Sequence, residues 1–382
     1  MTIIVSNLKK DIRGEEVLLT ADVSVEGRKE ICVMTQFGTL PSLIDGEARF
    51  DAFALMLLAP AMRMQLPLVI EGEVDDLLLF NLQGTVQDLI RITLPETKPI
   101  SISAVPRLPQ KQKSLRVTAT AFSGGIDSSY VLLKCRSQSG VPSNLHTDLL
   151  LHHDIGAFSE RSHYEDSLKH VLTEADRHGL PLAGVRCDMP KWNAPWPFAR
   201  VHSLCNVAAA LSLGNHFTDF VYASGHSISE TLRSRPFKKV DVMYHLLFPS
   251  LETHEHSFRV FGSCKTRTQK MVELLEDGSL THSLSVCSRM RRRNPEFLNC
   301  GTCGKCLRLI MLAEALGKKE QLRHGFDLDA FERDRSRCEL KFLKGATMSS
   351  MAESDRQLAS HLSQHGYRFP WPIKLWLGRL AA

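Results

Sequence analysis

Hydrophobic positions follow two different patterns along the chain, and the change comes near residue 105. Before it, short apolar runs of β-strand type stand between polar turns. One helix is expected over 50–59, where apolar residues recur at helical spacing and Pro60 would end the helix. The pattern predicts a β-rich accessory domain over residues 1–105. The strand-like runs lie at 3–5, 16–19, 31–33 and 66–70.

Beyond residue 105, a Pro-, Lys- and Gln-containing segment at 106–114 is typical of a linker, and predicted strands and helices then alternate. Because parallel strands need long crossover connections, this order predicts an α/β domain with a parallel sheet over 115–345. A helical C-terminal tail is expected over 346–382. The strands are predicted at 115–122, 148–153, 182–187 and 219–224, and the helices at 127–137, 159–178 and 198–213.

Composition adds little to this picture. Lys and Arg total 47 against 42 Asp and Glu, a formal net charge of +5, which does not by itself call for a nucleic-acid partner. The sequence has neither a signal-peptide pattern nor an apolar run near the roughly 20 residues that cross a bilayer. We expect a cytoplasmic protein without a membrane partner, whose apolar-aromatic end at 371–380 packs on its own core or on a second copy in a homodimer.

A predicted strand-to-helix turn carries the hexapeptide Ser123-Gly124-Gly125-Ile126-Asp127-Ser128. The two glycines let the backbone approach an anion and adopt positive φ, and the N–H groups of the helix's first turn would point at that anion. The two serine hydroxyls add donors. Asp127 would repel a phosphate, so we expect it to hold Mg²⁺ instead. The loop predicts a site for the phosphates of ATP.

Four of the ten cysteines are clustered, because Cys287 is followed by Cys300, Cys303 and Cys306. Cysteines of a cytoplasmic protein are reduced thiols or metal ligands, and four thiolates at this spacing fit a tetrahedral Zn²⁺ site. An iron–sulfur cluster uses the same ligand set and stays open as the alternative. We expect a structural zinc site, since four protein ligands leave no position for water.

The hexapeptide resembles the signature of the PP-loop, or N-type ATP pyrophosphatase, superfamily. The four cysteines behind such a loop are similar to the zinc site of 7-cyano-7-deazaguanine synthases (QueC-like proteins). The resemblance covers about residues 115–315 and implies a Rossmann-like, adenine nucleotide alpha hydrolase-like fold. It departs from that family at Asp154-Ile155-Gly156 and at Arg200-Val201-His202, on the side expected to bind substrate.

Several polar residues are expected at the carboxyl ends of the parallel strands, where ligands bind in such sheets. Asp154 is placed near the adenosine, and Gly225 at the end of the fourth strand. His226 is either a base or a polar bystander. Arg267 and Lys270 are expected to stabilise charge at the α-phosphate, with solvated helix charges as the alternative.

The resemblance implies cleavage of ATP to AMP and pyrophosphate, with adenylation of a carboxylate that an amine then converts to an amide or nitrile. The substrate would be a small molecule such as a deazaguanine carboxylate, or the acceptor a protein amine. Two alternatives stay open at this point. One is a tRNA-thiolating or base-modifying PP-loop enzyme that uses Cys187 and Cys205, and the other is a nucleotide-binding scaffold without turnover.

Overall fold

The computed structural model describes residues 1–109, 115–136, 140–157, 160–194, 196–233, 244–287, 296–347 and 352–369. The chain divides into two compact units. Unit 1 contains Met1–Phe122, Lys134–Ser224 and Thr231–Phe261, and unit 2 contains Ser123–Leu133, Gly225–Glu230 and Gly262–Ala382. No helix among the described residues is both long and apolar enough to span a membrane.

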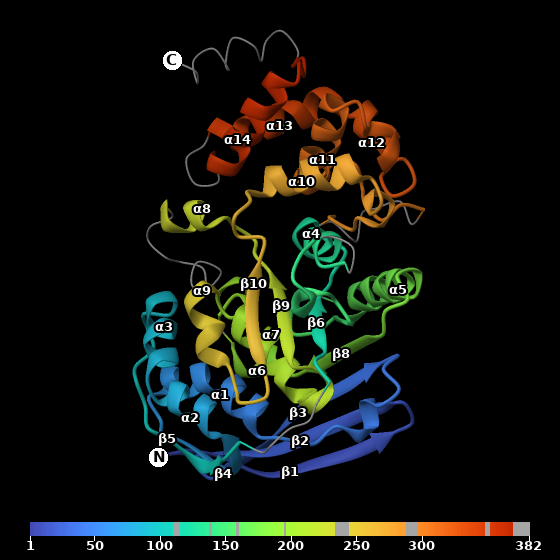
Figure 1. Cartoon of the computed structure of the whole chain (residues 1–382). Helices are drawn as coiled ribbons and strands as arrows, with labels where there is room; N and C mark the ends of the chain where they lie inside the picture. The colour runs from blue at the N-terminus through green and yellow to red at the C-terminus, as the bar shows by residue number, and fades with distance from the viewer. Residues whose placement is uncertain are drawn as a thin grey trace. The chain divides into compact units, whose positions relative to one another are not determined.

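Unit 1 is built on a ten-stranded sheet with the order β10-β9-β6-β7-β8-β3-β2-β1-β4-β5 (Figure 1). The five strands from β10 to β8 are parallel, and their order is that of a doubly wound sheet: successive strands are added on one side of β6 as far as β8, and then on its other side from β9 to β10. The strands are β1 (Ile3–Arg13), β2 (Glu16–Val25), β3 (Arg28–Gly38), β4 (Leu68–Asp75), β5 (Ile102–Arg107), β6 (Thr118–Ala121), β7 (Leu149–Leu151), β8 (Leu182–Cys187), β9 (Asp219–Ala223) and β10 (Ser257–Phe261).

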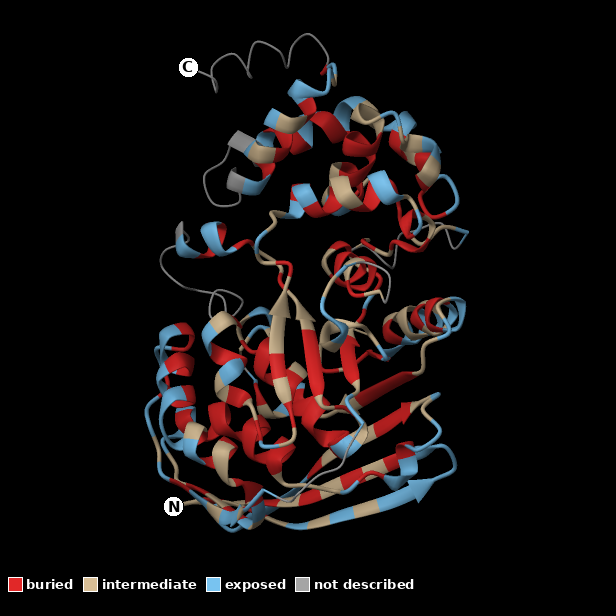
Figure 2. Cartoon of the chain, viewed as in Figure 1, coloured by how far each residue is buried: buried red, intermediate tan, exposed pale blue. Residues whose placement is uncertain are grey.

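Burial explains why the two halves of the sheet have different sequences. The parallel strands β6, β7 and β9 are buried along most of their length, as Figure 2 shows, because helices cover both faces. In β2, buried and partly exposed residues alternate, which is the pattern of a strand with one face on the core. The predicted α/β fold is therefore confirmed in its parallel sheet.

The N-terminal strands differ from the predicted organisation. β3 pairs antiparallel with β8 in the register Met34↔Cys187 to Gly38↔Ala183, so residues 1–105 extend the sheet of the following region. The boundary predicted at 105 does not separate two sheets. Apolar alternation shows that a strand has a buried face, but it does not identify the strand edge that it joins.

Helices of unit 1 complete the core. They are α1 (Asp51–Met64), α2 (Asp76–Gln83), α3 (Thr85–Thr93), α5 (Arg161–Arg177), α6 (Met189–Trp192), α7 (His202–Ser212) and α9 (Tyr244–Leu247). α1 packs on α7 and β4, and residues 51–62 of α1 are buried. The prediction that Pro60 ends this helix is wrong, because the helix continues to Met64. The burial of its apolar side chains compensates for the backbone hydrogen bond that proline cannot donate.

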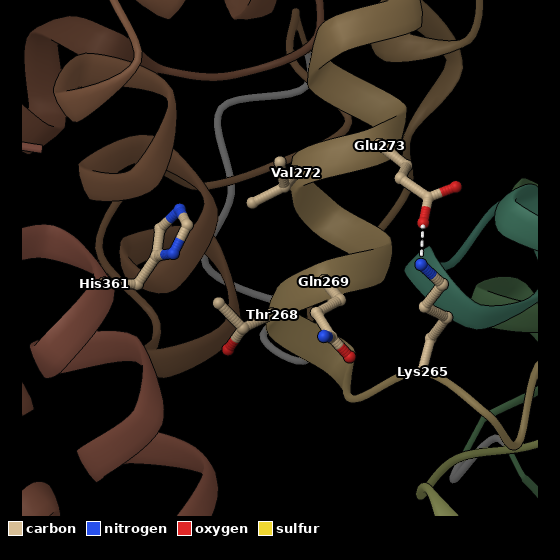
Figure 3. A pocket seen from close by; sticks show the side chains of 6 residues that line it. All are labelled: Lys265, Thr268, Gln269, Val272, Glu273 and His361. Atoms are coloured by element: carbon tan, nitrogen blue, oxygen red, sulfur yellow. Dashed lines mark ion pairs between the residues drawn. The ribbon is translucent and has the colours of Figure 1, made fainter. Parts of the chain in front are cut away.

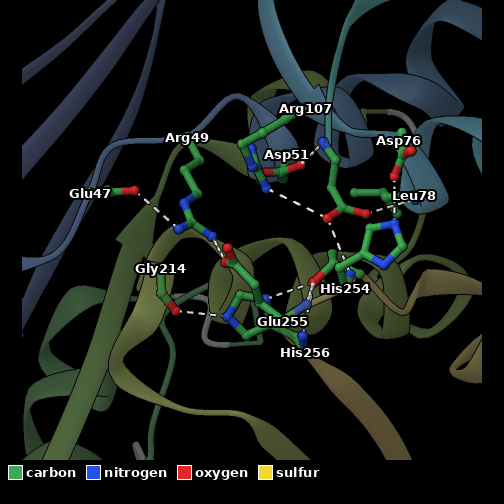
Figure 4. A network of polar contacts seen from close by, with 12 residues as sticks. Glu47, Arg49, Asp51, Asp76, Leu78, Arg107, Gly214, His254, Glu255 and His256 are labelled. Carbon is green, nitrogen blue, oxygen red and sulfur yellow. Dashed lines mark hydrogen bonds and ion pairs between the residues drawn. The ribbon is translucent and has the colours of Figure 1, made fainter. Parts of the chain in front are cut away.

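A network of charged residues links distant segments within unit 1 (Figure 4). Asp75 caps α2 by accepting the N–H of Leu78 at 3.2 Å, and it also accepts the N–H of His254 at 3.1 Å. Asp51 accepts the Asp75 N–H at 2.7 Å and a guanidinium N–H of Arg107 at 2.9 Å. These bonds tie α1, α2 and β5 to the turn before β10.

Unit 2 is mainly helical. It contains most of α4 (Ile126–Lys134), the start of α8 (Ile228–Arg233), and α10 (Arg267–Asp277), α11 (Gly304–Ala315), α12 (Leu328–Arg333), α13 (Arg335–Thr347) and α14 (Ala352–Gln364). α10 begins with a capping box between Thr266 and Gln269 and ends at left-handed Gly278. The predicted tail boundary at 345/346 falls inside α13. The predicted contact of residues 371–380 lies outside the described residues.

Candidate functional site

The 123–128 loop has the conformation that its glycines predict. Gly124 has a φ of 71°, and α4 begins directly after Gly125. The Ser128 hydroxyl lies 3.2 Å from the Ser123 N–H, and at the same distance from the Gly125 carbonyl to which it donates. These bonds close the loop upon itself. The first N–H groups of α4 have no partner within the helix, as at any helix start, and form the donor set that an anion would use.

Asp127, Arg267 and Lys270, which the sequence analysis selects separately, lie together in unit 2. The Asp127 carboxylate contacts an Arg267 guanidinium nitrogen at 2.7 Å and the Lys270 ammonium at 3.2 Å through its other oxygen. Arg267 also donates to the Gly225 carbonyl at 3.1 Å. Residues 127, 225 and 267 therefore form one cluster at the start of α4, although about 140 residues separate its two ends in the chain.

The two cations of this cluster differ in burial. The Lys270 side chain is 1% exposed, whereas that of Arg267 is 44% exposed. Burial lowers the pKa of Lys270, and the charge of Asp127 opposes this shift. Tyr130 of α4 contributes its ring face at 5.9 Å from the Lys270 nitrogen. Lys270 is thus a fixed part of the cluster, and Arg267 is the member that can move into solvent.

The position of Asp127 changes its expected role. Both of its oxygens contact cations, so Mg²⁺ would bind here only in exchange for one of them. Arg267 is the one that can be displaced at small cost, because it is exposed. Mg²⁺ usually keeps several waters and takes one or two carboxylates besides phosphate oxygens. Asp127 fits such a ligand set as a single carboxylate, and it also orients Arg267 and Lys270.

The four clustered cysteines converge as predicted, with their sulfur atoms within 4.8 Å of one another. The Cys303 Sγ lies 3.4 Å from that of Cys306 and 4.0 Å from that of Cys287. A tetrahedral ion with metal–sulfur bonds of about 2.3 Å places its sulfurs about 3.8 Å apart. The group has the donor set and spacing to hold a metal such as zinc. Cys303 stands at the N-cap of α11, whose dipole favours thiolate charge there.

Asn299 holds the two arms of this metal centre together, and the sequence analysis does not identify it. Its side chain is fully buried, and its oxygen accepts the N–H groups of Val286 at 2.8 Å and Cys287 at 3.1 Å. Its amide nitrogen donates to the carbonyls of Leu284 and Gly325. An asparagine directly before the second cysteine was the only available signal. Arg289, Arg291, Arg292 and Arg293, whose charges would offset that of the thiolates, lie outside the described residues.

Gly301, between the second and third cysteines, has a φ of 69°, and a Cβ atom at this position would lie 2.0 Å from the Asp327 carbonyl oxygen. Only glycine allows this close approach of the two backbone segments. The backbone therefore makes a tight turn at this glycine. It fixes the spacing between Cys300 and Cys303.

The other residues singled out in the sequence make different contacts. Asp154 belongs to unit 1, where its carboxylate lies 4.0 Å from the Arg186 guanidinium and burial raises its pKa. His226 is partly buried in unit 2. Burial raises the pKa of Cys187 and brings that of Cys205 to about 12, so both thiols are poor nucleophiles near neutral pH.

A second group, Asp75, Asp76 and His254, also has the spacing of a metal site. Its carboxylates are already used within the network of Figure 4, where Asp76 and His254 form a hydrogen bond at 2.6 Å. Asp75 accepts two backbone N–H groups and lies 3.8 Å from Arg107. We interpret this group as structural.

Comparisons of the chain with protein-family models, with curated proteins and with solved structures find no match. The functional interpretation therefore depends on the geometry of the two sites in unit 2.

Proposed function

We propose that the chain is an ATP-dependent enzyme of the QueC-like PP-loop type, which adenylates a carboxylate and releases pyrophosphate. The observation that carries the proposal is the cluster of Asp127, Arg267 and Lys270 at the end of the 123–128 loop. A helix start rich in N–H donors and two cations beside it form a favourable environment for a polyphosphate. The doubly wound order of the parallel sheet supports the same interpretation.

In the proposed reaction, a carboxylate oxygen of the substrate attacks the α-phosphorus of ATP. The bond from that phosphorus to the bridging oxygen breaks, and pyrophosphate leaves with the electron pair. An amine then attacks the acyl carbon and displaces AMP, which gives an amide. A nitrile would require a second ATP for dehydration.

Each residue of the cluster has one task in this scheme. N–H groups of the 123–128 loop bind the phosphate oxygens, and Arg267 and Lys270 stabilise the charge that develops on the leaving pyrophosphate. Asp127 keeps Lys270 in place, and it would hold Mg²⁺ in exchange for its contact with Arg267; Mg²⁺ neutralises phosphate charge when bound. The four cysteines would hold zinc as a structural ion.

The thiolation alternative receives less support, because the two thiols it requires are buried and have raised pKa values. The scaffold alternative differs from an enzyme only in turnover. A product assay therefore separates it from the proposed function.

The test is an ATP–pyrophosphate exchange assay with a panel of carboxylates that includes a deazaguanine carboxylate. We expect exchange with at least one carboxylate, and a loss of roughly 100-fold or more in Arg267→Met, as when a charge-stabilising group is removed from a transition state. Arg323→Gln, which changes an exposed arginine of unit 2 paired with Glu320, should keep full exchange. Full exchange in Arg267→Met, or none with any carboxylate, contradicts the proposal.

A further inference from the structure

His361 and His365 lie one helical turn apart at the C-terminal end of α14. The His365 N–H donates to the His361 carbonyl at 3.1 Å, so the helical turn continues to His365. Side chains at positions i and i+4 share one face of a helix, and a His pair at this spacing is a well-established arrangement for chelating a metal. The two ring centroids are 4.3 Å apart.

This ring spacing allows a single ion to bind both imidazoles. With metal–nitrogen bonds of about 2.1 Å, each ring centroid lies roughly 3.2 Å from a bound ion, so two rings on one ion are at most about 6.4 Å apart. The observed separation is well inside that limit. The turn is also the last of a 13-residue helix, where the helix dipole favours a cation.

His361 has an available ligand atom. Its Nε2 is buried and has no hydrogen-bond partner within the part of the chain that the structure describes. Burial is the largest cause that lowers the pKa of His361, and His365 adds to it, so the ring is neutral near pH 7 and its lone pair is available. The exposed carboxylate of Glu276 on α10 has the opposite effect, because it raises the pKa of His361.

Open space adjoins the His361 ring. Figure 3 shows the ring between α14 and α10, beside Thr268 and Val272. The space there measures 190 Å³, and a second space of 320 Å³ that His361 also lines continues past Ser360 and Gln364. Lys265, the cation that lines the first space, is paired with Glu273 at 3.0 Å. An ion and its waters can therefore reach the imidazoles.

We infer that His361 and His365 form a second metal site that binds a divalent transition-metal ion such as Zn²⁺, Ni²⁺ or Cu²⁺. Imidazole is a good ligand for all three, and two imidazoles leave open positions for water. The site differs from the four-cysteine centre in its ligands and in its exposure. It does not depend on the proposed activity.

The test is a calorimetric titration of the tag-free, zinc-loaded full chain with Ni²⁺. We expect one equivalent bound beyond the four-cysteine centre, with a dissociation constant in the micromolar range. Because His365 is exposed, His365→Asn leaves the fold intact and should weaken binding at least tenfold. His324→Asn, which changes another exposed histidine of unit 2, should leave it unchanged.

A second measurement identifies the ligand atoms. One equivalent of Cu²⁺ should show electron paramagnetic resonance couplings from two imidazole nitrogens, and His365→Asn should lose one of them. Unchanged Ni²⁺ affinity in His365→Asn overturns the inference, and so does binding of no additional equivalent by the wild-type chain.

Discussion

The two units are stabilised by different kinds of interaction. Unit 1 has a continuous hydrophobic core in which strands and helices bury Val, Leu, Ile and Ala side chains, with the histidines His152, His153 and His256 buried beside it. Unit 2 also buries apolar side chains such as Leu309, Ile310 and Phe331, and its helices are joined in addition by ion pairs such as Arg308–Asp355, at 2.5 and 2.8 Å, and by the four-cysteine group. The candidate chemistry is concentrated in unit 2.

This contrast indicates where each unit is sensitive. A sheet with a large apolar core needs no ion, but its neutral histidines make it sensitive to acid. A helical unit arranged around thiolates and charged side chains depends on its metal and on its charge pairs. The proposed ATP site belongs to the second kind, so its geometry should respond to metal loading and to single charge changes.

The largest expected effect is loss of the metal. Cys303→Ser should reduce the stability of unit 2 by several kcal/mol or more, since the binding free energy of a structural zinc is largely folding free energy. Hydrogen-exchange mass spectrometry should show lost protection in α11–α14 and a much smaller change in the strands of unit 1. Cys264→Ser, at an exposed cysteine, is the control. Equal loss of protection in both units would contradict the contrast.

Acid should affect unit 1 first. Burial lowers the pKa of His152 and His256 to about 4 and that of His153 to about 3, below the ordinary value of 6.5. Between the ordinary pKa and these lowered values, the three histidines bind protons in the unfolded chain but not in the folded chain. The free energy of unfolding therefore falls as the pH drops from about 6.5 to 4. The cost is roughly 3 kcal/mol for each histidine.

Urea unfolding at pH 7 and at pH 4.5, followed by hydrogen exchange in the two units, measures this effect. His256→Gln should reduce the pH dependence. His163→Gln, on the surface helix α5, should not. The same pH dependence in His256→Gln as in the wild type would show that burial of this ring does not cause the acid sensitivity.

Asn299→Ala tests the support of the metal centre. It leaves the buried N–H groups of Val286 and Cys287 without their acceptor, which should cost roughly 3 kcal/mol. Metal affinity should fall 10- to 100-fold, as for other residues that orient ligands. Competition with a chromogenic chelator measures the affinity, with exposed Asn215→Ala as the control. Wild-type affinity in Asn299→Ala would mean that Cys287 is positioned without this side chain.

The smallest effect concerns the charge pair of the candidate site. Asp127→Asn leaves Lys270 buried without its counter-ion and should destabilise unit 2 by about 2 kcal/mol, more than Lys270→Met does. It should also lower the pKa of Lys270 further, because Asp127 opposes the effect of burial. Nitrogen-15 NMR of the lysine ammonium group would report that shift. Greater destabilisation by Lys270→Met would contradict the assignment of Asp127 as the stabilising partner.

The sequence predicts local features well where one short segment determines them. The strand at 182–187 has the bounds of β8, the 123–128 segment leads from β6 into the first turn of α4, and the four cysteines converge. Each depends on residues close in the chain, namely apolar runs, glycines at a turn and metal-ligand spacing. The chemistry of Asp127, Arg267 and Lys270 identifies them in the sequence, but only the folded structure shows that their side chains are in direct contact.

Features that depend on pairing between distant segments could not be predicted in this way. The pairing of β3 with β8 turns the expected accessory domain into part of one sheet, and no local pattern encodes the partner of an edge strand. Pro60 stays inside α1 because tertiary burial outweighs a local helix-ending signal. Asn299 acts through four backbone groups from two segments, which only the folded chain brings together.

The central claim is that the cluster at the 123–128 loop directs cleavage of ATP between its α and β phosphates. Incubation of the zinc-loaded chain with ATP labelled in its α-phosphate, Mg²⁺ and the carboxylate panel tests it most directly. The account predicts labelled AMP together with pyrophosphate, and loss of both in Asp127→Asn and in Arg267→Met. Labelled ADP as the product, or AMP formation that both variants retain, would contradict it.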